Sequence, residues 1–159
     1  MFEPYGVTIF CDDIRSEIGG KHTLVGVYGS NLIIKKAKPA ILPLISVAAT
    51  IVIPNEFKAT TMIYRLKRYK TEDDLGSDDY EILVESKREL KNKPITPGRV
   101  SREVEMFSLS QLQVEDDCLL ASRAYFEDLE VKLGVLIVKF RPDKSNAASS
   151  PSKRAKPGD

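Results

Sequence analysis

The 159-residue sequence contains only one histidine and two cysteines. Both residue types are common in metal and catalytic sites. With His22 alone, zinc sites that need two histidines are excluded, and a Ser–His–Asp or Cys–His centre would depend on that one residue. We assign His22 no catalytic role, because it follows a Gly-Gly-Lys turn where exposure is expected. Cys11 and Cys118 are too few for a disulfide framework. Both lie among apolar residues, so we expect buried thiols, with a disulfide between them as the alternative.

Long apolar segments are also missing. The longest, residues 41–53, is shorter than the ~20 residues that cross a bilayer and includes Pro43, Ser46 and Thr50. The N-terminal residues show neither the basic region nor the apolar run of a signal peptide. These absences predict a cytoplasmic protein that does not associate with membranes.

Charge is balanced over the whole chain but not along it. The net charge is +1, with 42% hydrophobic and 30% charged residues, which is ordinary for a globular protein. From residue 144 onward, four basic side chains against one Asp make +3, so residues 1–143 carry −2. Residues 143–159 lack large apolar side chains, and we predict a disordered basic tail there. Residues 1–142 then form one mildly acidic domain, which is not the charge pattern of a nucleic-acid-binding protein.

Within residues 1–142 the main hydrophobic period is two, which predicts β-strands. Residues 62–67 and 80–85 alternate as half-exposed strands do, whereas residues 7–14, 24–34 and 42–53 are apolar on both faces and predict strands covered on both sides. The fold class predicted is all-β, an antiparallel β-sandwich of about eight strands, at about residues 5–18, 21–34, 43–53, 60–70, 79–87, 100–109, 118–128 and 131–141.

Turn signals agree with these strands. Gly19-Gly20 separates two of the apolar runs and predicts a hairpin turn, because glycine adopts positive φ without steric cost. Residues 108–113 and 87–91 are the two places where a short helix could form.

A motif near the N-terminus resembles a known family. The residues are Phe10-Cys11-Asp12-Asp13-Ile14-Arg15, then Gly20-Lys21, then Gly26-Val27-Tyr28, followed by Leu42-Pro43-Leu44. This pattern resembles a family of bacterial and phage-associated proteins catalogued as a domain of unknown function. The resemblance covers the first third of the chain by motif and the rest by strand pattern only. It implies a small β-sandwich and no catalytic activity.

The predicted hairpin carries the most unusual local chemistry. Asp12 and Asp13 lead into it, with Arg15, Glu17 and Lys21 close behind. Successive strand residues point to opposite faces, so the two aspartates enter one pocket only if the strand is bulged. Arg15 could lie between two carboxylates on one face. The row would be either a polar binding site or a set of salt bridges that fixes the hairpin register.

Acidic pairs recur in the predicted loops, and a hard cation such as Ca²⁺ binds carboxylates from flexible loops. A metal site would require the pairs to converge, and we take Asp12, Asp13, Asp116 and Asp117 as its candidate ligands. Aspartate is also a preferred turn residue for local reasons, which is the competing interpretation. The other pairs are Asp73-Asp74, Asp78-Asp79 and Glu127-Asp128.

A basic run at residues 64–70 interleaves cations with aromatic side chains, as some surfaces that bind single-stranded nucleic acids do. Its candidate contacts are Arg65, Lys67 and Arg68. The competing interpretation is an edge or exposed strand whose cations discourage aggregation.

No phosphate loop, nucleophile pattern or metal spacing emerges, so we predict a non-enzymatic binding or protein-interaction module. The predicted partner is another protein or a second copy of the chain, and no cofactor is expected, with a metal ion left open. The alternatives are a metal-dependent enzyme or metal-regulated module with Asp-rich loops, and a single-stranded nucleic-acid-binding protein.

Overall fold

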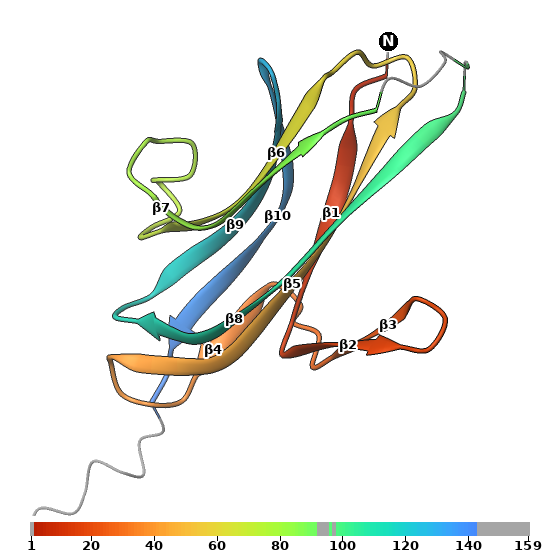
Figure 1. Ribbon diagram of the computed structural model, residues 1–159. Helices are drawn as coiled ribbons and strands as arrows, with labels where there is room; N and C mark the ends of the chain where they lie inside the picture. Colours follow the sequence, from red (N-terminus) through yellow and green to blue (C-terminus); the bar gives the residue numbers. More distant parts are fainter. Residues whose placement is uncertain (1, 92–95, 97, 143–159) are drawn as a thin grey trace, which may run out of the picture.

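The computed structural model describes residues 2–91, 96 and 98–142, and within these ranges every regular element is a β-strand. The all-β prediction is confirmed, with ten strands instead of about eight (Figure 1). The predicted tail, residues 143–159, lies outside the described residues. The strands are β1 (Tyr5–Cys11), β2 (Asp13–Glu17), β3 (Lys21–Val25), β4 (Asn31–Ile34), β5 (Ala40–Pro54), β6 (Thr61–Tyr69), β7 (Glu81–Glu89), β8 (Val100–Val114), β9 (Cys118–Phe126) and β10 (Leu129–Phe140).

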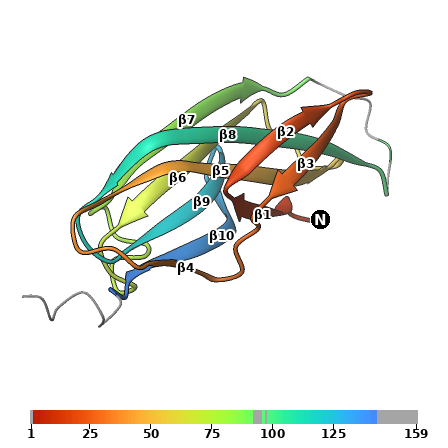
Figure 2. The ribbon, with the colours of Figure 1, turned by 90° about the horizontal axis from the view of Figure 1, so that it is seen from below.

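Two sheets face each other to form the sandwich (Figures 1 and 2). One has three strands in the order β1-β5-β8, and the other has five in the order β4-β10-β9-β6-β7. All pairs are antiparallel except β4 with β10, which is parallel. β2 and β3 form a separate two-stranded sheet.

The two additional strands arise where long apolar runs bend. At Asp12 the chain leaves β1, and the Asp12 N–H donates to the Val25 carbonyl at 2.9 Å instead of continuing the pairing with β5. Residues 26–30 leave the second run as a loop, which divides it into β3 and β4. Neither of the two possible short helices forms, because residues 108–113 lie in β8 and residues 87–91 lie mostly in β7.

The core lies between the two sheets. Tyr64 of β6 stacks on Phe107 of β8 with ring centroids 5.5 Å apart. The Tyr64 hydroxyl is hydrogen-bonded to Ser122 Oγ at 3.0 Å, and burial raises the Tyr64 pKa to about 12. Thr8 Oγ1 donates to the same Ser122 Oγ at 2.7 Å, which ties β1 to the opposite sheet. Both cysteines are buried free thiols.

Edge and central positions differ from the prediction at several strands. β1 and β4 were predicted to be covered on both faces, but alternate side chains of each are exposed, and each is an edge strand. β6, predicted as an edge or exposed strand, lies between β9 and β7. The part of the chain that is described has no helix of the length and apolarity needed to span a membrane.

Candidate interaction surface

β1 carries three of its four large apolar side chains on its outer face, and only Phe10 is buried in the core. Tyr5, Val7 and Ile9 point away from the core and are 61%, 57% and 36% exposed. Gly6 and Thr8, between them, point inward. A half-buried strand normally directs its apolar set to the core, because burial of each such side chain contributes roughly 1.5–3 kcal/mol.

Two of the inward positions of β1, those of Gly6 and Thr8, must be small because β10 passes close by. A Cβ on Gly6 would lie 2.8 Å from Leu133 Cδ2 of β10 and would collide with the carbonyl oxygen of Thr50. Thr8 packs near Gly134, also of β10. The close approach of β1 and β10 therefore leaves no room for large inward side chains at positions 6 and 8, whereas Phe10, farther along β1, is buried in the core.

The first half of β8 shows the same inversion. Glu103 and Glu105 point inward, and Arg88 of β7 forms ion pairs with both. Val104, 38% exposed, points outward. The register β1-β5-β8 places the outward residues in adjacent rows. We call this surface the outer patch, and it consists of Tyr5, Val7, Ile9, Ala48, Thr50, Val52, Arg102, Val104 and Met106.

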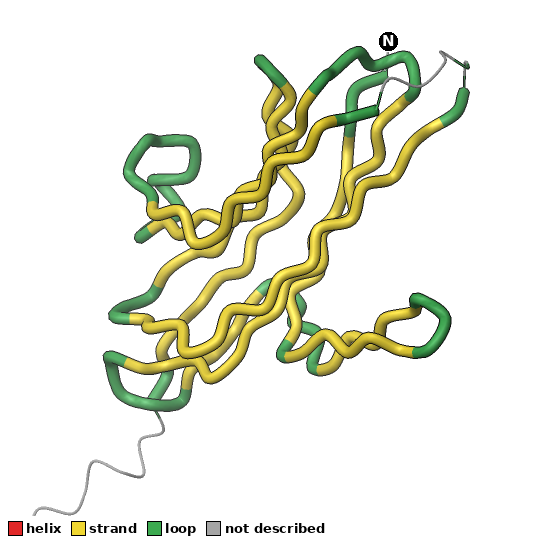
Figure 3. Tube along the Cα trace, in the orientation of Figure 1, coloured by secondary structure: helices red, strands yellow, loops and turns green. Residues whose placement is uncertain are grey.

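The β2–β3 hairpin, residues 13–25, projects from the outer side of the three-stranded sheet (Figures 1 and 3). We call it the arm. Its half nearer the tip, residues 15–23, is exposed on both faces, and Ile18 at the tip is 97% exposed. The predicted hairpin turn is confirmed, with φ of 82° at Gly19 and 71° at Gly20. An isolated two-stranded hairpin is marginally stable in water, so contacts beyond its own two strands are needed to hold the arm.

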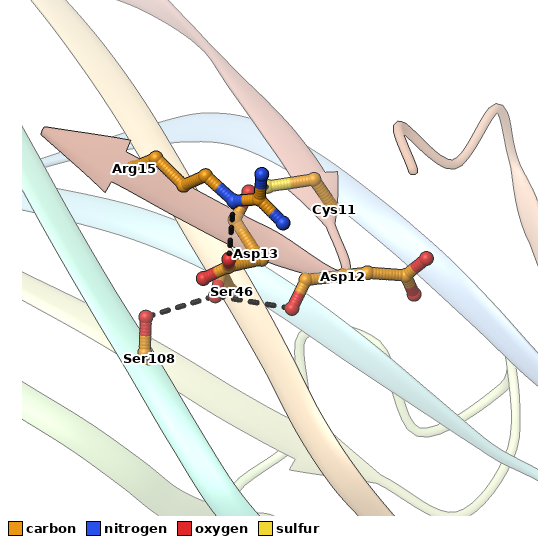
Figure 4. A network of polar contacts seen from close by, with 6 residues as sticks. All are labelled: Cys11, Asp12, Asp13, Arg15, Ser46 and Ser108. Atoms are coloured by element: carbon orange, nitrogen blue, oxygen red, sulfur yellow. Dashed lines mark hydrogen bonds and ion pairs between the residues drawn. The ribbon is translucent and has the colours of Figure 1, made fainter. Parts of the chain in front are cut away.

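A polar network attaches the arm to the sheet (Figure 4). Ser46 Oγ of β5 lies 2.8 Å from Ser108 Oγ of β8 and 3.4 Å from the Asp12 carbonyl oxygen. The Cys11 thiol donates to the Asp13 carbonyl at 3.5 Å. Burial and the nearby Asp12 carboxylate raise the pKa of the Cys11 thiol, which keeps this donor protonated.

The two aspartates at the base of the arm point to different sides, as strand geometry predicted (Figure 4). Asp13 Oδ2 accepts a hydrogen bond from Arg15 Nε at 3.1 Å. Asp12 instead accepts a hydrogen bond from the Tyr28 hydroxyl. Burial raises the Tyr28 pKa, and the bond to Asp12 raises it further. Because Tyr28 follows β3, this bond closes the base of the arm on its second strand.

Gly26 makes that closure possible. Its φ is +64°, and a Cβ there would lie 2.6 Å from Asp12 Cγ. We expect Gly26→Ala to destabilise the base of the arm by about 1–2 kcal/mol, because alanine strains this left-handed conformation and displaces Asp12. Hydrogen exchange of the amides of residues 13–25 should accelerate about tenfold. Gly29→Ala is the matched control, since nothing lies within 4 Å of its added Cβ, and equal exchange in both variants would contradict this role of Gly26.

The predicted row of charges on the hairpin forms only in part. Arg15 pairs with Asp13, and Glu17 and Lys21 make no ion pair within the described chain. Both are exposed near the tip of the arm, where they are available to a partner.

The four candidate metal ligands lie in two separate places. Asp12 follows Cys11, which pairs with Ser46 of β5, whereas Asp116 and Asp117 follow Val114, which pairs with Ala40 at the start of β5. Six residues of strand separate these positions, roughly 20 Å at ~3.3 Å per residue. Asp116 and Asp117 instead pair with Lys38. Among the residues whose placement is described, no three His, Cys, Asp or Glu side chains gather as metal ligands would.

The candidate nucleic-acid contacts have partners inside the domain. Arg65 pairs with Glu85 at 2.6 Å, and Arg68 pairs with Glu81 at 2.9 Å through Nε. Lys67 is 6% exposed, with its Nζ 3.7 Å from the centroid of the Tyr80 ring. Burial alone would lower the Lys67 pKa, but the neighbouring tyrosines hold it above its usual value. These three cations therefore do not form an open platform for phosphates.

Comparison with protein-family models, with curated proteins and with solved structures finds no match to this chain. The resemblance to a bacterial and phage-associated family stays a prediction based on the N-terminal motif.

The outer patch is the surface that sequence analysis missed. Tyr5, Val7 and Ile9 alternate with Gly6 and Thr8, and that alternation was a usable signal for a one-sided strand. Hydrophobic period alone assigns the apolar set to the core. Only the position of β10 shows that it faces outward.

Proposed function

We propose that this protein is a non-enzymatic protein-interaction module that binds its partner through the outer patch and the arm. The outward row on β1 supports this proposal, because three large apolar residues in one row face away from the main core between the two sheets. Exposed apolar surfaces of this kind mark sites of protein contact.

The arm supports the same function. It adds exposed polar and charged side chains, among them Arg15, Glu17 and Lys21, beside the apolar patch. Protein interfaces commonly combine an apolar centre with a polar rim. The polar network at Ser46 and Ser108 holds the arm next to the patch, so one partner can touch both.

Site-specific photocrosslinking tests the proposal. A benzoyl-phenylalanine placed at Val7 or at Ile18 is expected to form discrete light-dependent adducts in the cells that produce the protein. The adducts from position 18 should disappear when Val7 is changed to Asp, because that change disrupts the patch without touching the core. Ile82 of β7, 43% exposed on the other sheet, is the control position. Equal labelling from all three positions, or none from any, would contradict the proposal.

A further inference from the structure

A hollow of about 240 Å³ opens at the end of the three-stranded sheet farthest from the arm. Phe2, Tyr5, Pro54 and Val100 form most of its apolar wall, and Glu3, Glu56 and Arg99 also line it. Phe2 is 79% exposed and Val100 is 56% exposed. A hollow surrounded by large exposed apolar side chains is suited to receive an apolar side chain from another protein surface.

The chain itself carries a side chain of that kind. Ile18 at the tip of the arm is 97% exposed, the highest exposure among the large hydrophobic residues of the described chain. The arm cannot place it in the hollow of the same molecule, because the arm follows the C-terminal end of β1 and the hollow lies at the N-terminal end of that strand (Figure 1).

The positions of the arm and the hollow along β5 are symmetric about Thr50. The arm leaves the sheet beside Ser46, which pairs with Cys11. The hollow lies beside Pro54. Thr50 is four residues from each, and it lies in the outer patch opposite Val7. Consider a two-fold axis that lies between the two copies beside Thr50, parallel to the sheets and at right angles to β5. This axis brings the base of one arm opposite Pro54 of the second copy.

We propose that the partner of this surface is a second copy of the same chain. The outer patches stack face to face about that axis, and Ile18 of each arm enters the hollow of the other copy. This inference rests on the proposed function and names its partner. It makes the interface isologous, with the same patch, arm and hollow used twice.

The arm is long enough for this contact. Strands of five residues extend about 17 Å at ~3.3 Å per residue, whereas packed sheets lie ~10 Å apart. The arm therefore crosses the layer between the sheets and reaches the level of the second copy. The patch alone, three strands about 4.8 Å apart and five residues long, covers on the order of 240 Å². A standard interface buries about 800 Å² per partner, so the arms must supply the rest.

The charges permit the pairing. Arg102 is the one charged residue of the outer patch, and the net charge of the chain is only +1, so two copies repel each other weakly. Lys21, next to the tip of the arm, makes no ion pair within the described chain. In the second copy it would approach Glu3 and Glu56, which line the hollow.

Sedimentation velocity of the full chain over about 1–100 μM tests the dimer. The expected mass is twice 17.8 kDa. Val7→Asp and Ile18→Asp should each raise the dissociation constant at least tenfold, because each places a charge in the contact and neither residue touches the core. Ile82→Asp on the other sheet is the matched control and should leave the constant unchanged.

A cysteine pair tests the orientation. Ile18→Cys combined with Val100→Cys should form a covalent dimer under mild oxidation, because the tip of one arm meets the hollow of the other copy. Ile18→Cys combined with Ile82→Cys should not. Covalent dimers at equal rates in both double variants would overturn the proposed contact.

The two proposals can fail separately. A monomer at every concentration, together with photocrosslinks from Val7 to a different protein, would overturn the dimer and leave the interaction module standing. A dimer that neither Val7→Asp nor Ile18→Asp weakens would also overturn this interface. A monomer with no patch-specific crosslinks would overturn both.

Discussion

Replacing Arg88 by alanine is expected to lower the free energy of unfolding by about 3 kcal/mol. Glu105 is 2% exposed and points between the two sheets, where Arg88 forms its ion pair. Removal of one member of a buried pair leaves an uncompensated charge, which costs about 3–5 kcal/mol. We expect the lower end of that range, because the Arg88 side chain is 45% exposed and water can partly replace it.

Arg88 also bridges the sandwich. It donates to the carbonyl oxygen of Val104 at 3.2 Å and approaches Glu103 at 3.9 Å, so it joins β7 of one sheet to β8 of the other. Arg88 forms an ion pair with Glu105 Oε1, but the two groups are not aligned for a hydrogen bond. Arg88 therefore stabilises the buried carboxylate mainly through its charge.

Urea unfolding at one fixed protein concentration measures the effect. Adding Glu105→Gln to the Arg88→Ala variant should recover part of the loss, because the buried charge is then gone. Lys70→Ala is the control, since Lys70 pairs with Asp79 at 3.6 Å on the surface and such pairs contribute at most about 1 kcal/mol. If Arg88→Ala is no more destabilising than Lys70→Ala, the buried charge of Glu105 does not depend on Arg88.

Gly6→Ala is expected to destabilise the domain by about 2–3 kcal/mol, although alanine is the smallest substitution available. The added Cβ would collide with the Thr50 carbonyl oxygen, which belongs to the backbone of β5 and cannot rotate away. It would also lie 2.8 Å from Leu133 Cδ2 of β10. Overpacking of this kind typically costs about 1–3 kcal/mol, and a backbone neighbour places it at the upper end.

Gly134→Ala is the matched control for Gly6→Ala. Gly134 lies on β10 across from β1, and its added Cβ would be 3.5 Å from Thr8 Cβ, an ordinary contact. We expect a change of less than about 1 kcal/mol there. Thermal unfolding of both variants at the same protein concentration compares them, and equal destabilisation would show that close packing of β1 and β10 does not require glycine at position 6.

The hairpin of the arm could be predicted because its signals are local. Gly19-Gly20 between two apolar runs predicts a turn wherever the rest of the chain lies, and the turn is present. The opposite directions of Asp12 and Asp13 also followed from the alternation of strand side chains. The break at Asp12 could not be predicted, because residues 5–18 have the composition of a continuous strand. It depends on the hydrogen bond from the Asp12 N–H to Val25, a residue distant in sequence.

The basic run at residues 64–70 shows the limit of charge as a signal. Interleaved cations and aromatics are compatible with a nucleic-acid platform, and an edge or exposed strand is the simpler interpretation of the same residues. The structure has neither, because β9 and β7 flank β6 and bring Tyr125, Tyr80 and Glu85 to its cations. These partners come from other strands, and their register is set by long-range pairing that no local pattern contains.

The sequence by itself determined the all-β class, the hairpin turn and the absence of a zinc site that needs two histidines, because each follows from residue type and local spacing. Only the tertiary structure decided which face of each strand is buried. The two-residue alternation of side chains along a strand places Tyr5, Val7 and Ile9 on one face, but it does not specify which layer lies against that face. The close approach of β10 leaves room only for small residues at the inward positions 6 and 8, and the apolar row of Tyr5, Val7 and Ile9 faces outward to form the surface proposed to bind a second copy.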